Sequence, residues 1–165
     1  MRHRAAVRSA SSMRAVHVLV ATDAQWVLDE VVAALGSPST SFQVVTNGRK
    51  VADVVAARTP DIAILDLQVG AMGGMAITMD LRLDASSGML PHVPVLMLLD
   101  REVDVHMARR SGANGWIIKP LDALRLRRAV DAVVSGGCYA EGIPADAPAE
   151  TAGPEAAEES ADSLA

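Results

Sequence analysis

The chain has 165 residues, of which 50% are hydrophobic and 21% are charged, and this suits one globular domain with a sizeable core. Its single cysteine, Cys138, excludes an internal disulfide and any zinc site built from several cysteines. A net charge of −5 gives no support for a nucleic-acid surface, and no apolar stretch approaches the length of a membrane span.

Strands and helices are predicted to alternate along the middle of the sequence. Short apolar runs predict the strands, and apolar residues at helical spacing predict the helices. In chain order the predicted elements are strand 17–21, helix 24–36, strand 41–45, helix 49–58, strand 61–66, helix 73–85, strand 93–99, helix 102–113, strand 115–118 and helix 121–137. This alternation implies right-handed crossovers and a doubly wound parallel sheet covered on both faces.

The two ends of the chain differ in composition from this alternating region, which is predicted to form one domain over residues 15–137. Residues 1–14 are basic and are predicted to be a disordered extension. Residues 138–165 are rich in Ala, Pro and Glu and are predicted to be a disordered tail. Every charged side chain from Glu141 onward is acidic, so this tail could bind a basic partner or shield the run Arg125–Arg128 of the same chain.

Polar side chains stand at the carboxyl ends of several predicted strands, where ligands bind in open parallel sheets. Thr22 and Asp23 follow the first strand, Asp66 ends the third, and Lys119 follows the fifth. Two close carboxylates repel unless a cation lies between them, and Asp23, Asp66 and a carbonyl near Gln68 could supply oxygen ligands to Mg²⁺. Lys119 would attract an anion, and Asp66 would be a nucleophile, so the pattern predicts phosphoryl transfer.

Four motifs between residues 16 and 134 resemble the receiver domains of bacterial two-component response regulators. In order, they are VLVATD, PDIAILDLQVGAMGG, PVLMLL and SGANGWIIKP. The resemblance implies a flavodoxin-like (βα)5 fold with strand order 2-1-3-4-5. It also implies phosphorelay signalling by a stand-alone response regulator that takes a phosphoryl group from a histidine kinase or phosphotransfer protein. Such a protein signals by protein–protein contact and is not an enzyme in the ordinary sense.

The resemblance implies a role for several individual residues. Asp66 corresponds to the phosphoacceptor, and Asp23, Asp66 and the backbone oxygen of Gln68 correspond to the Mg²⁺ ligands. Lys119 corresponds to the lysine that contacts the phosphoryl group, and its bond to the following proline is typically cis in the family. Trp116 corresponds to the switch aromatic, although packing of this side chain is an equal alternative.

Two positions depart from the family pattern. Thr22 stands where most receivers have a second acidic residue, so weaker Mg²⁺ binding is expected. Leu99 stands at the switch position where a Ser or Thr hydroxyl normally binds the phosphoryl group. These departures favour an alternative, a pseudo-receiver that acts as a phosphorylation-independent interaction module. A Mg²⁺-dependent phosphatase is less favoured, because such enzymes typically carry a second acid where Gln68 stands.

Partners and surface residues follow from the same resemblance. A downstream protein is expected to bind the face of the fourth helix, fifth strand and fifth helix, which includes His106, Arg110, Trp116 and Arg125–Arg128. The same face could form a homodimer. Asp100 is interpreted as part of a solvated helix start. No direct nucleic-acid or membrane partner is expected, and the expected location is the cytoplasm.

Overall fold

The computed structural model describes residues 15–142, in which strands and helices alternate as the apolar pattern predicts. The strands are β1 (Val16–Ala21), β2 (Thr40–Val45), β3 (Ile62–Asp66), β4 (Val95–Leu99), β5 (Gly115–Ile118) and β6 (Tyr139–Ala140). The helices are α1 (Gln25–Leu35), α2 (Val51–Ala57), α3 (Gly74–Ser87), α4 (Val105–Arg110) and α5 (Ala123–Val134), with 3₁₀ turns η1 (Gly48–Lys50) and η2 (Glu102–Asp104).

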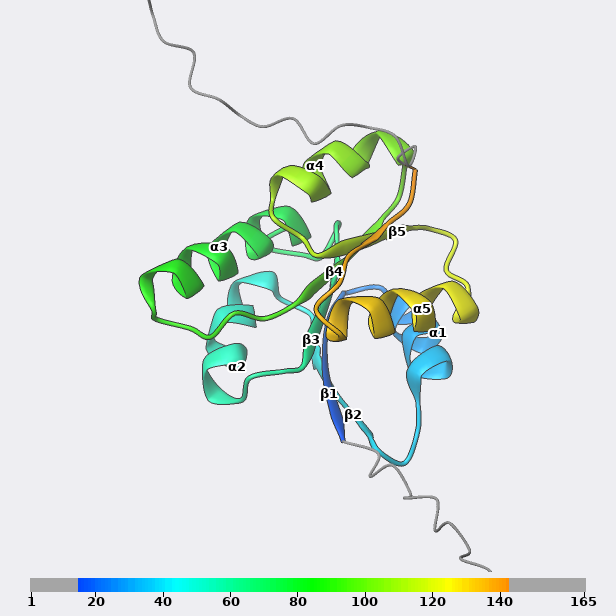
Figure 1. Cartoon of the computed structure of the whole chain (residues 1–165), viewed down its shortest axis with the longest axis horizontal. Helices are drawn as coiled ribbons and strands as arrows, with labels where there is room; N and C mark the ends of the chain where they lie inside the picture. Colours follow the sequence, from blue (N-terminus) through cyan, green and yellow to red (C-terminus); the bar gives the residue numbers. More distant parts are fainter. Residues whose placement is uncertain (1–14, 143–165) are drawn as a thin grey trace, which may run out of the picture.

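The strands form one sheet in the order β2-β1-β3-β4-β5-β6, and every neighbouring pair is parallel. Helices α1 and α5 cover one face of this sheet, and α2 and α3 cover the other (Figure 1). The predicted flavodoxin-like architecture and the strand order 2-1-3-4-5 are therefore confirmed. The sixth strand, at the outer edge of β5, was not predicted.

The core fills both faces of the sheet because successive strand side chains point in opposite directions. Val18 and Val20 of β1 belong to the cluster that includes residues of α1 and α5, whereas Leu19 and Ala21 belong to the cluster with residues of α2 and α3. The uninterrupted apolar runs of β3 and β4 are buried throughout, as expected for central strands of a parallel sheet.

Side-chain hydrogen bonds fix two of the helices. Asp122 precedes α5 and accepts hydrogen bonds from the backbone N–H groups of Leu124 and Arg125 at 3.0 and 2.9 Å, which caps the helix. Arg82 of α3 donates to the carbonyl oxygens of Val93 and Gly112 at 2.9 Å each. It also donates to Asn114 Oδ1 at 2.7 Å, so α3 is tied to the segments that precede β4 and β5.

Several predicted boundaries differ from the structure by one to three residues. Strand β4 begins two residues after the predicted start at 93, because Pro94 has no N–H to donate to the sheet. The predicted helix 102–113 divides into η2 and a six-residue α4, and Gly112 adopts a positive φ of 83° just beyond it. Only Val105 and Ala108 of α4 are buried.

The predicted end of the domain at residue 137 is too early. The chain continues along β5 through residues 138–142, and two residues of this segment form β6. A two-residue strand is too short to produce a detectable apolar period. The predicted basic extension, residues 1–14, and the rest of the predicted acidic tail, residues 143–165, lie outside the described residues.

None of the helices between residues 15 and 142 combines the length and the apolar character needed to cross a membrane.

Candidate functional site

The carboxylate of Asp66 lies at the end of β3, buried and surrounded by hydrogen-bond donors. Lys119 Nζ donates to Asp66 Oδ1 at 2.8 Å, and the backbone N–H of Gln68 donates to the same oxygen at 3.2 Å. The hydroxyl of Thr22 donates to Asp66 Oδ2 at 3.0 Å. Asp66 is only 2% exposed, so this cation and these two neutral donors replace the hydration that the carboxylate loses on folding.

Lys119 joins the carboxylates of two neighbouring strand ends. Its Nζ also donates to Asp100 Oδ1 at 3.0 Å and lies 5.5 Å from the centre of the Trp26 ring. Burial lowers the pKa of Lys119, but the hydrogen bonds to Asp66 and Asp100 outweigh burial and raise the pKa above its usual value. Lys119 therefore remains a cation at neutral pH. The predicted cis bond between Lys119 and Pro120 is confirmed.

Thr22 contributes a hydroxyl where the family usually has a carboxylate. The side chain is buried, and its oxygen accepts a hydrogen bond from the backbone N–H of Ala24 at 3.1 Å while donating to Asp66. Both hydrogen-bonding roles of the hydroxyl are therefore satisfied within the fold. Replacing the carboxylate with this neutral group lowers the negative charge of the site and removes one source of repulsion toward Asp66.

Asp23 stands beside this cluster, exposed, at the end of β1. A Cβ atom added at Gly70 would lie 2.9 Å from Asp23 Oδ2, so the absence of a side chain at Gly70 leaves room for this carboxylate. Between residues 15 and 142, no group of three or more His, Cys, Asp or Glu side chains could hold a metal ion. A cation would therefore depend on Asp23, Asp66, a carbonyl oxygen and water, and this all-oxygen set fits Mg²⁺.

Leu99 and Trp116 lie together in an apolar cluster under the site. Leu99 is fully buried, and the buried members packed with it are Leu67, Met97, Val105, Ala108 and Trp116. Trp116 is 7% exposed, and its Nε1–H donates to the backbone oxygen of Glu141 at 2.9 Å. The structure thus shows Trp116 packed in the core, and Leu99 supplies no hydrogen-bonding group next to Asp66.

Two ion-paired residues were not assigned a partner from the sequence. Asp100, interpreted from the sequence as part of a solvated helix start, is exposed, and it also forms an ion pair with Lys119. Its position directly after an apolar strand is the signal that also marked Asp23 and Asp66. Glu141 was placed in a disordered tail, but it pairs with Arg125 of α5. Its acidic charge was the one sequence signal, because an acidic tail could contact the basic run Arg125–Arg128.

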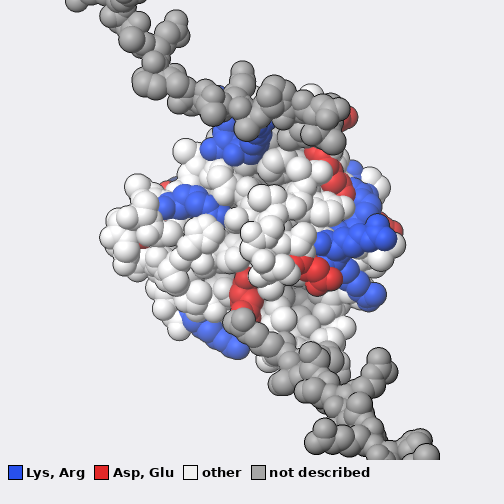
Figure 2. Space-filling view, viewed as in Figure 1, with Lys and Arg blue, Asp and Glu red and all other residues white. Residues whose placement is uncertain are grey.

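The outer surface near α5 is charged. Arg125, Arg127 and Arg128 all belong to this helix, and Figure 2 shows basic side chains gathered on that side of the molecule with acidic ones next to them. His106 and Arg110 of α4 are exposed as well. The face predicted to bind a downstream protein is thus accessible on both helices, whereas Trp116 between them is covered.

Curated relatives of this chain are bacterial regulators. Protein PilH of Pseudomonas aeruginosa is 30% identical over 77 residues, which cover 47% of this chain and 63% of PilH. The transcriptional regulatory protein CseB of Streptomyces avermitilis is 30% identical over 136 residues, which cover 81% of this chain and 55% of CseB. The chain therefore spans less than two thirds of the length of these relatives.

Two solved structures and a family profile also match this chain. The signal receiver domain of the response regulator NarL from Mycobacterium tuberculosis has a TM-score of 0.63 and 27% identity, over 74% of this chain and 98% of that one. The receiver domain of the sensor histidine kinase PA1611 from P. aeruginosa, with a magnesium ion coordinated in its active site cleft, shares the fold at a TM-score of 0.61 and 18% identity, over 73% and 98% of the chains. The response regulator receiver domain profile matches residues 18–131. The chain belongs to the family of response regulator receiver domains.

Proposed function

We propose that this chain accepts a phosphoryl group on Asp66 from a histidine kinase or phosphotransfer protein. The observation that carries the proposal is the 2.8 Å contact between Lys119 Nζ and the buried carboxylate of Asp66. A carboxylate oxygen would form a bond to phosphorus while the bond from phosphorus to the donor imidazole nitrogen breaks, and that nitrogen keeps the electron pair. Lys119 would then balance the charge on the phosphoryl oxygens. A cytoplasmic location is part of this proposal.

Magnesium is the proposed cofactor, held by Asp23, Asp66 and the backbone oxygen of Gln68, with water as the remaining ligands. When bound, it would reduce the repulsion between the phosphoryl group and the carboxylates. The magnesium in the PA1611 receiver domain supports this assignment. Because Thr22 is neutral, the affinity for Mg²⁺ is expected to be lower than at a site with three carboxylates.

The decisive test is exposure of the full chain to acetyl phosphate and Mg²⁺, followed by intact mass measurement. We expect a phosphoryl adduct on the wild type and no adduct on Asp66→Asn. Asp80→Asn is the matched control, because Asp80 is an exposed carboxylate on α3 outside the site, and it is expected to react like the wild type. Lack of an adduct on the wild type would refute the proposal and leave the phosphorylation-independent interaction module.

Gly70→Ala is expected to weaken Mg²⁺ binding about ten-fold, the effect typical of substitutions at residues that orient a metal ligand without binding the metal themselves. The added Cβ would stand 2.9 Å from Asp23 Oδ2 and force this carboxylate to turn. The free energy of unfolding without Mg²⁺ should change by less than about 1 kcal/mol, because the atom that must yield is the end of a flexible side chain. Calorimetric titration with Mg²⁺ measures the effect, and Asp23→Asn serves as the reference for loss of the ligand. Equal affinity of Gly70→Ala and wild type would contradict this role of Asp23.

Signal output is proposed to occur through the surface of α4, β5 and α5, called here the output face and marked by His106, Arg110 and the run Arg125–Arg128. The exposed residues of α4 and α5 support this placement. A downstream protein would recognise their charges, and a second copy of the chain could use the same surface as a homodimer.

A further inference from the structure

The outer edge of β5 is covered by the chain itself. Residues 138–142, called here the edge segment, run parallel to β5, with Tyr139 beside Gly115 and Ala140 beside Trp116. The backbone N–H of Tyr139 also donates to Asn114 O at 3.3 Å. Figure 1 shows the segment lying along β5 after the chain leaves α5. An edge strand exposes unpaired backbone groups that readily pair with another strand, and the edge segment satisfies these groups.

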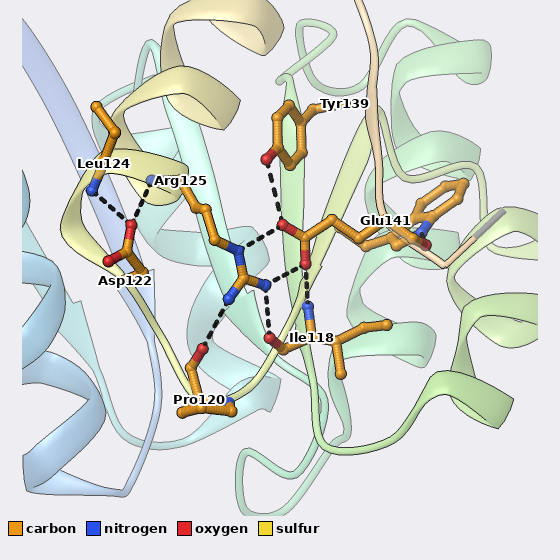
Figure 3. A network of polar contacts seen from close by, with 8 residues as sticks. Ile118, Pro120, Asp122, Leu124, Arg125, Tyr139 and Glu141 are labelled. Carbon is orange, nitrogen blue, oxygen red and sulfur yellow. Dashed lines mark hydrogen bonds and ion pairs between the residues drawn. The ribbon is translucent and has the colours of Figure 1, made fainter. Parts of the chain in front are cut away.

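The carboxylate of Glu141 accepts hydrogen bonds from four surrounding donors (Figure 3). Arg125 donates to both carboxylate oxygens, through Nε to Oε1 at 2.9 Å and through Nη2 to Oε2. The backbone N–H of Ile118 donates to Oε2 at 3.0 Å, and the hydroxyl of Tyr139 donates to Oε1 at 3.2 Å. Three of these four donors lie outside the edge segment, on β5 and α5. Two-point binding of a carboxylate by arginine is among the strongest hydrogen-bonded arrangements.

Arg125 is held by backbone oxygens as well as by the carboxylate. Its Nη1 and Nη2 donate to the backbone oxygens of Pro120 and Ile118 at 3.1 and 3.0 Å. Burial raises the pKa of Glu141, but the hydrogen bonds from Arg125 and Ile118 outweigh burial and bring the pKa below its usual value. These donors therefore suit an ionised carboxylate.

Apart from Glu141, the edge segment makes few contacts with the domain. Its strand has only two residues, and Gly136 and Gly142 at its ends adopt positive φ values of 84° and 73°. Cys138 and Ala140 are exposed, and Tyr139 is the one side chain of the segment that packs against the core. Because few contacts other than those of Glu141 hold the edge segment in place, another strand that carries a carboxylate could replace it.

We propose that the edge of β5, together with Arg125, is a binding site for an extended protein segment that carries a carboxylate, and that Glu141 fills this site from within the chain. A partner protein that presents such a segment adds its strand to β5 and places its carboxylate on Arg125. The edge segment competes with it at high effective concentration and lowers its apparent affinity. Placement of this partner on the output face rests on the proposed function; the carboxylate site itself does not.

The test uses the ¹⁵N-labelled full chain and a peptide with the sequence of residues 136–145, with serine in place of the cysteine. In Glu141→Gln, we expect the NMR signals of the Ile118 amide and the Trp116 indole N–H to move, because both groups donate to Glu141. Adding the peptide should return these signals saturably toward their wild-type positions. The same peptide with Gln for Glu should bind about ten-fold more weakly, because it lacks the charge-assisted hydrogen bonds. The wild-type chain should also bind the peptide at least about ten-fold more weakly, because its site is filled.

Two results would overturn the proposal. If the Ile118 and Trp116 signals of Glu141→Gln stay at their wild-type positions, Glu141 does not hold the segment. If they move but the peptide does not restore them, the edge is not an exchangeable site. The double variant Arg125→Gln/Glu141→Gln should not respond to the peptide, and the signals of β1 and β3 report whether each variant is folded. No phosphoryl donor is present, so the outcome is independent of the acetyl phosphate test on Asp66.

Discussion

Lys119→Met is expected to lower the free energy of unfolding by about 3 kcal/mol in the absence of Mg²⁺, the cost typical of breaking a buried ion pair from one side. The Asp66 side chain is 3% exposed, and Lys119 is its only cationic partner among residues 15–142. Without Lys119, the carboxylate keeps only the hydrogen bonds from Thr22 and Gln68. Urea unfolding at neutral pH measures the change.

A double-mutant cycle assigns this loss to the buried charge. Asp66→Asn/Lys119→Met should regain most of the stability, because it leaves no uncompensated carboxylate. Asp100→Asn is the matched control, since it removes the other carboxylate partner of Lys119. The Asp100 side chain is 36% exposed, so this substitution should cost less than about 1 kcal/mol. If Lys119→Met and Asp100→Asn cost the same, the burial of Asp66 is not what makes Lys119 necessary.

Leu99→Ala is expected to cost about 3 kcal/mol, within the range for truncating a buried leucine. Leu99 has no exposed surface, and its removal would open a cavity between β4, α4 and Trp116. Leu99→Met keeps most of the volume and should cost less than about 1.5 kcal/mol. Leu124→Ala, on the exposed side of α5 at 56% exposure, should change stability by less than about 0.5 kcal/mol. Thermal and urea unfolding compare the three variants, and equal costs for Leu99→Ala and Leu124→Ala would show that Leu99 is not a core residue.

Much of the fold could be predicted because the central strands are strongly patterned. The apolar runs that end at Asp66 and Leu99 are typical of central strands in a parallel sheet, and their alternation with helical patterns predicted the class of the fold. Boundaries were harder, since the absence of an N–H at Pro94 and the left-handed backbone at Gly112 act on single residues. The second residue of β6, Ala140, carries no patterning signal at all.

The site was partly predictable for a geometric reason. Parallel strands present their carboxyl ends at one edge, so Thr22, Asp66 and Lys119 could be brought together from sequence order alone, and the structure places them within hydrogen-bonding distance. The pairing of side chains on the surface does not follow from the order of the strands. The pairing of Glu141 with Arg125 depends on how the chain turns after α5, and net charge suggested only that acidic and basic residues could meet there.

The short helix α4 has a consequence for how the domain moves. Six residues make fewer than two helical turns, and only two of these side chains are buried, so local opening of this helix is expected to need far less free energy than unfolding of the whole domain. α3, by contrast, is fastened by three hydrogen bonds of Arg82. Backbone motion on the microsecond to millisecond timescale is therefore expected in α4, which should exchange its amide hydrogens and admit a protease before α3 does.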